Sequence, residues 1–174
     1  QVKIRGYRVE PAEHTTLDGH CADAITVAQA LHWFDLPRFI DELGRVAKPG
    51  ALFVAWAYAG CSVDARVDAV IAQLYDGTLG AYWPPERTLV DEGYASLALP
   101  FTAVSAPRFE MRVQWNARQL LAYLASWSAA QRYRAATGED AIAATTQALH
   151  AAWGDPEQVR EVRWQLAVRA CRID

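Results

Sequence analysis

The hydrophobic and polar positions between Asp23 and Trp56 follow the pattern of one βαβ unit. Ala24 to Ala30 is an apolar run without charge or alternation, which favours a parallel strand covered on both faces. Asp35 can cap the next element, and Pro37 suits the first turn of a helix. Apolar side chains then recur three and four residues apart, on one helical face: Leu36, Phe39, Ile40, Leu43 and Val46.

A second apolar run completes the unit. Pro49-Gly50 is expected to end the helix, and Leu52 to Trp56 is expected to return parallel to the first strand through a right-handed crossover. Ligands of such sheets lie just beyond the carboxyl ends of the strands. Here those ends are residues 29–33 and 57–60.

The middle of the chain predicts a helix and then a loop. Apolar positions from Val63 to Tyr75 fit a helical face, with Ser62 as its expected cap. The prolines of residues 80–87 predict a loop, which we expect to fold over the strand ends. Its aromatic residues Tyr82 and Trp83 can equally serve to anchor an ordered connection.

The last third of the chain mixes strand and helix patterns. Phe109 to Trp115 alternates cleanly and predicts a strand with one buried face. Asn116 is expected to cap one long helix that ends near Gly138. A further helix is expected from about Asp140 to Trp153, and residues 162–170 alternate again as a final strand.

Composition limits the class of protein. The 174 residues suffice for one domain with a sizeable core, and 52% hydrophobic with 21% charged residues is typical of a soluble globular chain. A net charge of −3 favours neither nucleic acid nor an anionic membrane as a partner, and no run is long enough to span a bilayer. Three isolated cysteines fit a reducing cytoplasm better than a disulfide framework.

The motifs of the first third resemble the second half of a class I S-adenosylmethionine-dependent methyltransferase of the small-molecule, type 11-like kind. Four motifs carry the resemblance by their order and spacing, and it extends from about Tyr7 to the C-terminus. They are the loop of residues 11–17, Asp23 before the strand, the "QALHWF" stretch of residues 29–34, and "VAKPGAL" at residues 46–52.

The resemblance implies an α/β, Rossmann-like sheet that is truncated at the N-terminus. Strands three to seven of the family would be present with a helical insertion, strand three near Tyr7 to Glu10 and strand seven antiparallel between strands five and six. Residues 1–174 would form a single partial domain, in which residues 61–100 and 116–158 cover the substrate side. The chain starts with Gln and its single methionine is Met111, so we expect further sequence upstream.

The family's glycine-rich cofactor turn and ribose-binding acidic residue should precede this sequence. No two glycines here are separated by one residue, as a GxGxG turn requires. Without strands one and two, strand four of the family would expose an apolar edge, which invites pairing with another chain. We therefore expect the first residues to pair with strand four, or that edge to be buried in a partner, for example in a homodimer.

The resemblance also assigns candidate cofactor residues. Ala12 and Glu13 match the loop that contacts adenine, and Gln29 with Ala30 matches the strand end close to the methionine moiety. Two alternatives stay open: Glu13 as an exposed loop charge and Gln29 as a polar group that satisfies loose backbone.

The candidate catalytic residue is His32, which follows the strand where a substrate would lie and could accept a proton near neutral pH. A structural, hydrogen-bonded histidine among aromatic residues is the alternative. Candidate substrate residues share an aromatic or hydrogen-bonding side chain near the strand ends or in the family's variable region: Trp33, Trp83, Trp127, Arg132 and Tyr133. Helical aromatic residues can equally belong to a core.

Three functional hypotheses follow. The first is methyl transfer from S-adenosylmethionine to a small-molecule acceptor, without a metal, because His14, His20 and Cys21 lack metal-ligand spacing. On this hypothesis the chain alone binds the cofactor weakly or not at all. The second is a non-catalytic fragment that uses the sheet edge to bind itself or a partner. A hydrolase or dehydrogenase is the third, and neither a G-x-S-x-G elbow nor a dinucleotide fingerprint supports it.

Overall fold

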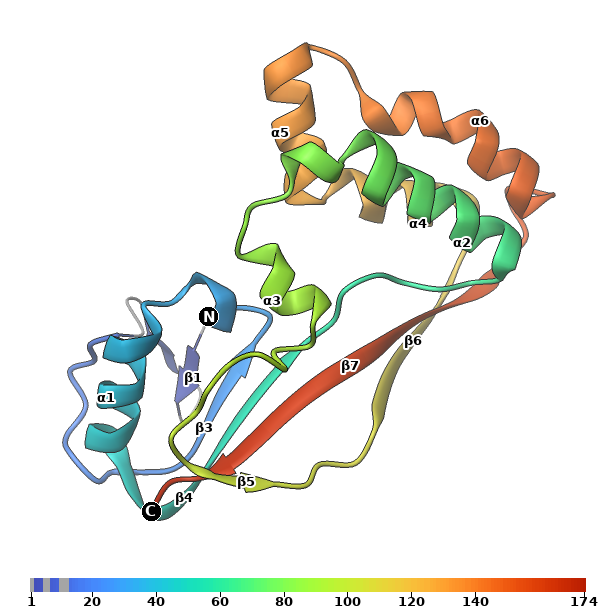
Figure 1. Ribbon diagram of the computed structural model, residues 1–174. Coiled ribbons are helices and arrows are strands. Elements are labelled where there is room, and N and C mark those ends of the chain that lie inside the picture. The colour runs from blue at the N-terminus through green and yellow to red at the C-terminus, as the bar shows by residue number, and fades with distance from the viewer. Residues whose placement is uncertain (1, 5–6, 10–12) are drawn as a thin grey trace. The chain divides into compact units, whose positions relative to one another are not determined.

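The computed structural model of the chain describes residues 2–4, 7–9 and 13–174, as one mixed sheet with helices (Figure 1). The chain divides into two units. Unit 1 contains residues 1–59, 86–109 and 165–174, and unit 2 contains residues 60–85 and 110–164. Ala12, a candidate cofactor residue, lies outside the described residues.

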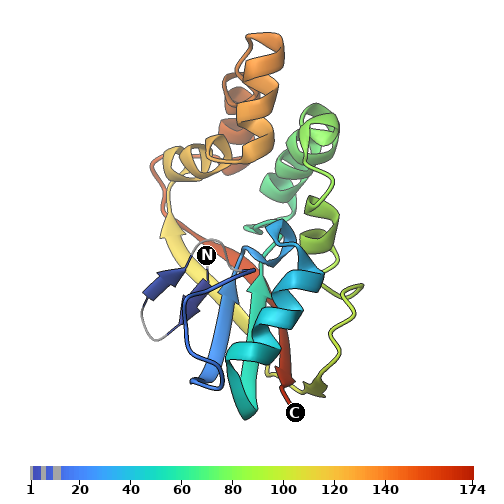
Figure 2. The same cartoon turned by 90° about the vertical axis from the view of Figure 1, so that its left-hand side faces the viewer.

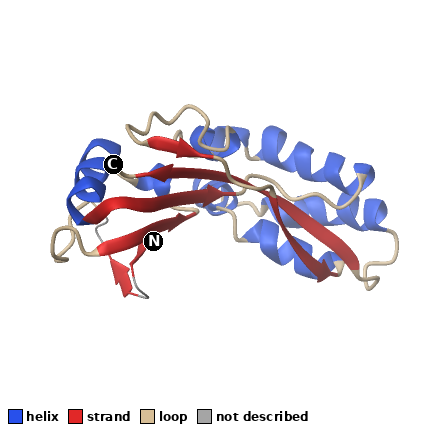
Figure 3. Cartoon of the chain, turned by 90° about the horizontal axis from the view of Figure 1, so that it is seen from below, coloured by secondary structure: helices blue, strands red, loops and turns tan. Residues whose placement is uncertain are grey.

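The strands are β1 (Val2–Ile4), β2 (Tyr7–Val9), β3 (Ala22–Ala28), β4 (Ala47–Ala57), β5 (Thr102–Val104), β6 (Phe109–Trp115) and β7 (Arg160–Arg172). Their order is β2-β1-β3-β4-β7-β5, and β6 pairs with β7 (Figure 3). The pairing of β3 with β4 is parallel, whereas β7 is antiparallel to both β4 and β5. The last strand lies antiparallel beside β4, as the resemblance implied, but its other neighbour in the sheet order is β5, a strand that the pattern did not predict. The predicted strand six, β6, pairs with β7 outside this order.

The predicted βαβ unit is confirmed. Helix α1 (Leu36–Val46) connects β3 to β4 and lies against one face of these strands (Figure 2). The Asp35 side chain caps it by accepting a hydrogen bond from the Arg38 N–H at 3.3 Å, and Pro37 occupies the first turn. The helix ends earlier than predicted, at Val46, because β4 begins at Ala47 and Pro49-Gly50 already belongs to the strand.

The expectation that the first residues pair with the strand at 22–28 is confirmed. Strand β1 runs antiparallel to β3, with Val2 opposite Val27 and Lys3 opposite Thr26. The predicted strand near Tyr7 is β2, which pairs with β1 and not directly with β3.

The expectation that β3 is covered on both faces was wrong. Ile25 and Val27 are fully buried, whereas Ala24 and Ala28 on the opposite face are exposed. The buried face packs against α1 and against Val90 and Tyr94. The described residues of unit 1 supply no helix to the other face, and the small, uncharged side chains there gave the run its apolar appearance.

The helices after β4 are α2 (Ala65–Ala72), α3 (Arg87–Asp91), α4 (Ala117–Ala125), α5 (Ser128–Thr137) and α6 (Ala141–Trp153). A π-helical turn, η2 (Gln73–Thr78), extends α2, and a 3-10 turn, η3 (Gly80–Tyr82), follows it. Asp64 caps α2 by accepting hydrogen bonds from the Arg66 and Val67 N–H groups. Ser62 is not the cap, because its backbone pairs with Arg163.

The single long helix predicted after Asn116 is in fact two helices. Asn116 caps the start of α4 as expected, and Gln119 makes this cap reciprocal. The helix stops at Ser126, whose hydroxyl donates to Tyr123 O at 2.6 Å, and Trp127 adopts an extended backbone before α5 begins. Gly138 ends α5 in the left-handed conformation, as predicted.

Strand β6 differs from its predicted burial. The alternating pattern predicts a buried face, but Phe109 and Met111 are 48% and 36% exposed. Only Val113 and Trp115 are partly buried on that face. The alternating pattern therefore predicted the strand correctly. No described part of the chain covers the side chains of its first half.

Candidate functional site

The carboxyl ends of β3 and β4 are joined by the side chain of Gln29. Its amide nitrogen donates to Tyr58 O at 3.0 Å, and its amide oxygen accepts from the Tyr58 N–H at 2.8 Å. Gln29 also has a φ of 50°, a conformation that is strained for a residue with a Cβ. Gln29 thus satisfies backbone groups, as the alternative interpretation held, and the two loops are held together where a ligand of this sheet would bind. The cofactor role of Gln29 and of the buried Ala30 stays a prediction.

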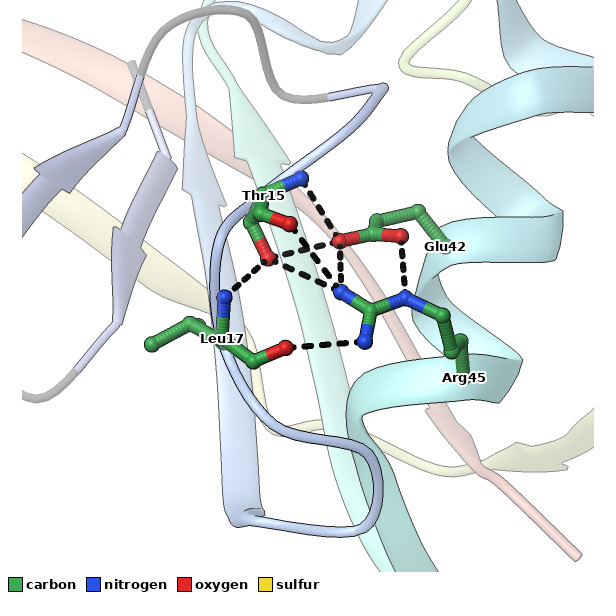
Figure 4. A network of polar contacts seen from close by, with 4 residues as sticks. All are labelled: Thr15, Leu17, Glu42 and Arg45. Atoms are coloured by element: carbon green, nitrogen blue, oxygen red, sulfur yellow. Dashed lines mark hydrogen bonds and ion pairs between the residues drawn. The ribbon is translucent and has the colours of Figure 1, made fainter.

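The loop before β3 is fixed to α1 by a buried polar network (Figure 4). Glu42, only 6% exposed, accepts hydrogen bonds from the N–H and hydroxyl of Thr15 at 2.8 and 2.6 Å. Arg45 donates to both carboxylate oxygens of Glu42, and also to the carbonyls of Thr15 and Leu17. Hydrogen bonds from Arg45 and Thr15 lower the pKa of Glu42 to about 2, although burial alone would raise it.

Glu13 attaches the same loop to the start of α1. Its Oε1 accepts the backbone N–H of Asp35 at 3.1 Å, and the side chain is partly buried. Glu13 and Thr15 therefore fix residues 13–17 along α1, at its N-terminus and near its last turns. Because of the bond to Asp35, this carboxylate is not merely an unattached loop charge. Among the described residues no group is hydrogen-bonded to Oε2 of Glu13, so this oxygen can still act as an acceptor.

His32 lies in the 3-10 turn η1 (Leu31–Trp33), directly after β3, and is 8% exposed. Its Nδ1 is 3.0 Å from the hydroxyl of Tyr94, which is fully buried. Burial, with a contribution from the Arg87 charge, lowers the pKa of His32 to about 4. The neighbouring Trp33 has its ring centroid 4.8 Å from that of His32 and is 53% exposed.

The other candidate substrate residues lie in unit 2. Trp83 and Trp127 pack together at 5.5 Å between ring centroids, and Trp83 also donates its indole N–H to Tyr75 O. These contacts favour the interpretation that Trp83 anchors an ordered connection. Arg132 is exposed, and Tyr133 donates its hydroxyl to Glu139.

A cavity of about 350 Å³ opens in unit 2 between α2 with η2 and α6. None of the candidate substrate residues lines it. Its lining residues are Ala69, Val70, Gln73, Leu74, Thr78, Ala144, Thr145 and Ala148.

The described part of the chain contains no cluster of metal ligands and no helix that could span a membrane. No group of three His, Cys, Asp or Glu side chains there could hold a metal ion, and His20 instead donates to Ala47 O at 3.0 Å. The three cysteines are free. None of the helices among these residues is long and apolar enough to cross a bilayer.

The sequence pattern missed Tyr94 and Glu42 as site residues. Glu42 had a detectable signal, because it falls three residues after Phe39 and four before Val46, on the apolar face of α1. Tyr94 had none, because its contact with His32 joins residues 62 positions apart.

Comparison with known proteins gives one consistent class. The family described as a methyltransferase domain matches residues 1–55. A solved structure from Anaeromyxobacter dehalogenans, named as a candidate type II methyltransferase, is 48% identical, with a TM-score of 0.88 over 96% of this chain and 71% of its own. The chain therefore belongs to the class I S-adenosylmethionine-dependent methyltransferases and has their Rossmann-like α/β fold.

Two further relatives agree. A protein of Dictyostelium discoideum named as a methyltransferase is 30% identical over 139 residues, which are 78% of this chain and 53% of the relative. An uncharacterized methyltransferase of Mycobacterium bovis is 48% identical over 46 residues, 26% of this chain and 19% of its own. The chain thus spans about half of the Dictyostelium relative and a fifth of the mycobacterial one.

Proposed function

We propose that the chain is the C-terminal part of a catalytic domain that transfers a methyl group from S-adenosylmethionine to a small-molecule acceptor. The observation that carries the proposal is the double hydrogen bond between Gln29 and Tyr58, which fixes together the two loops beyond parallel strands β3 and β4. Ligands of doubly wound sheets bind at such ends. The 48% identity to a structure named as a candidate type II methyltransferase supports the same chemistry.

We propose that Glu13, Gln29 and Ala30 bind one part of the cofactor. Glu13 is fixed by Asp35 through one oxygen, which leaves its second oxygen to accept a hydrogen bond from the amino group of adenine. The backbone of Gln29 and Ala30 would bind the methionine moiety beside the strand end. When bound, the cofactor supplies an electrophilic methyl carbon on sulfur, so the protein mainly has to bind and orient the acceptor.

We place the acceptor beside His32 and Trp33, in η1. Trp83, Trp127, Arg132 and Tyr133 stay proposed acceptor-binding residues. Aromatic rings such as those of Trp83 and Trp127 suit an apolar or planar small molecule. A cytoplasmic location is part of the proposal, since free thiols fit a reducing compartment.

Calorimetric titration of S-adenosylmethionine tests the proposal. We expect tight binding by the full-length protein, and weak or no binding by the 174-residue chain, which lacks a glycine-rich turn. The matched variants are Glu13→Gln and, as a control on an exposed loop charge nearby, Asp18→Asn. Glu13→Gln should lower affinity while Asp18→Asn should not. Full-length protein that fails to bind the cofactor would refute the proposal.

The role of His32 is tested in the full-length enzyme. His32→Ala should lower turnover far more than cofactor affinity, because His32 is proposed to face the acceptor and not the adenosine. Unchanged turnover with a purified methyl acceptor would remove His32 from the site.

Self-association through the edge of β3 is the alternative function, and a homodimer formed in this way remains a proposal. Strand β1 already pairs with β3 at Val27 and Thr26, which weakens the case for that edge. Sedimentation velocity over a range of protein concentrations separates the two, because edge pairing predicts a concentration-dependent dimer that does not require cofactor.

A further inference from the structure

Tyr94 is held in one position by several independent contacts. Its φ is 61°, an unfavourable conformation for a bulky residue. Its backbone N–H donates to Leu89 O at 2.7 Å, and its carbonyl accepts from Arg169 Nη1 at 2.9 Å. The side chain is fully buried. Strain of this kind costs about 1–3 kcal/mol and persists only where the surroundings determine the conformation. The fold therefore fixes the backbone of Tyr94, and complete burial of the side chain restricts the position of its hydroxyl.

The hydrogen bond between Tyr94 and His32 has a definite direction. Among the described residues, Nδ1 of His32, 3.0 Å away, is the acceptor within hydrogen-bond distance of the buried Tyr94 hydroxyl, so the single phenolic proton is donated to Nδ1. A neutral imidazole that accepts at Nδ1 carries its own proton on Nε2.

Both groups are neutral over the physiological range. Burial and the positive charge of Arg87 lower the pKa of His32 to about 4, and the opposing effect of Glu86 is smaller. Burial raises the pKa of Tyr94 to about 12. Arg87 is itself paired with Asp91 at 3.0 Å. The pair therefore keeps its protons in one arrangement while the solution pH changes.

Nε2 of His32 remains available to a ligand. Among the described residues, no group forms a hydrogen bond with this atom. Every buried side-chain nitrogen or oxygen of these residues does have a hydrogen-bond partner. Nε2 therefore reaches the accessible surface, directly after the carboxyl end of β3.

We infer that Tyr94 is a positioning residue that fixes His32 in the Nε2–H tautomer, so that His32 binds the methyl acceptor as a neutral hydrogen-bond donor and not as a base. The acceptor is then a molecule with a hydrogen-bond-accepting oxygen, such as a carboxylate or carbonyl, beside the atom that is methylated. The identity of the ligand rests on the proposed function, whereas the tautomer of His32 does not.

Nitrogen-15 NMR of histidine-labelled protein tests the tautomer directly in the 174-residue chain. Long-range couplings to the ring protons distinguish a protonated from an unprotonated nitrogen. We expect His32 to show protonated Nε2 and unprotonated Nδ1, without titration from about pH 5.5 to 8. Protonation on Nδ1, or titration of His32 near the ordinary histidine pKa, would overturn the inference, and this wild-type measurement needs no variant to fold.

Two variants separate positioning from a purely structural role. Tyr94→Phe removes the hydroxyl but keeps the ring, and it should give a mixture of tautomers at His32, while the control Tyr82→Phe should leave the spectrum of His32 unchanged. Diethyl pyrocarbonate, which acylates unprotonated imidazole nitrogen, should modify His32 several-fold faster in Tyr94→Phe than in wild type, as read by mass spectrometry. Equal spectra and equal rates would contradict the assignment.

The result is distinguishable from failure of the proposed function. If the full-length protein does not bind S-adenosylmethionine, methyl transfer is refuted while the NMR result stands. In an active enzyme, His32→Gln retains an N–H donor and should keep more turnover than His32→Ala. Equal loss in both variants, with the tautomer unprotonated at Nε2, would instead favour a base.

Discussion

Replacing Glu42 by glutamine should destabilise unit 1 mainly by removing the charge that Thr15 and Arg45 bind. The wild-type carboxylate accepts two hydrogen bonds from Thr15 and two from Arg45, at 2.6 to 2.8 Å. The amide of the Glu42→Gln variant would keep an oxygen for Thr15 but present a donor to the Arg45 guanidinium. Breaking a buried ion pair costs about 3–5 kcal/mol. Because the Arg45 side chain is 41% exposed and can rehydrate, we expect about 2–3 kcal/mol.

The lowered pKa of Glu42 leads to a similar free energy of stabilisation. A fall from the ordinary value of 4.5 to about 2 corresponds to about 3 kcal/mol, a large share of the stability of a typical domain. Since the folded-state pKa is lowered, this stabilisation is present above pH 4.5 and is lost as the pH falls towards 2. The difference in unfolding free energy between wild type and Glu42→Gln should therefore decrease by about 1 kcal/mol when the pH is lowered from neutral to about 3.5.

Urea unfolding followed by far-ultraviolet circular dichroism measures both effects. The control is Asp41→Asn, which removes the same charge from the exposed neighbouring position of α1 and should change the unfolding free energy by less than about 0.5 kcal/mol. The reasoning is refuted if Glu42→Gln is no less stable than Asp41→Asn at neutral pH. It also fails if the difference between Glu42→Gln and wild type does not depend on pH.

Two further predictions concern backbone conformation and capping. Gly93→Ala should destabilise the protein more than Gly50→Ala. Both glycines have a positive φ, which costs a residue with a Cβ about 1 kcal/mol. Of the two, only a Cβ on Gly93 would clash, because it would lie 2.8 Å from the Cβ of Ala167. Equal losses in denaturant titrations would show that the clash relaxes freely. Asn116→Ala should cost about 1 kcal/mol by removing the reciprocal cap with Gln119, and Asn116→Asp should recover most of it. An unfolding midpoint unchanged in Asn116→Ala would contradict this.

The sequence predicted local features well because their causes lie within a few residues. Asp35, Pro37 and the apolar spacing of α1 act through neighbouring turns, and the parallel return of β4 follows from the length of the connection. The helix break at Ser126 was missed for the opposite reason. The apolar spacing from Leu120 to Trp127 continues across it, while the break depends on where Trp127 packs in three dimensions.

The candidate site was predictable in position and not in detail. Parallel strands place their carboxyl ends at the same edge, so Gln29 and His32 could be assigned to it from the sequence. Their actual partners, Tyr58 and Tyr94, come from other segments, and no local pattern encodes such a meeting. The burial of a strand likewise depends on segments that are distant in the sequence. The predicted burial of β3 and β6 was for this reason greater than the burial in the structure.

The cluster around Trp127 gives unit 2 an optical signature of its own. Only Trp33 and Trp56 of the seven tryptophans lie in unit 1; unit 2 contains Trp83, Trp115, Trp127, Trp153 and Trp164. Trp127 has the rings of Tyr75, Trp83 and Tyr123 within 6 Å, at distances where excited states couple. Near-ultraviolet dichroism on heating will therefore report chiefly the melting of unit 2, and a separate probe on unit 1 would reveal whether the two units melt in one step or in succession.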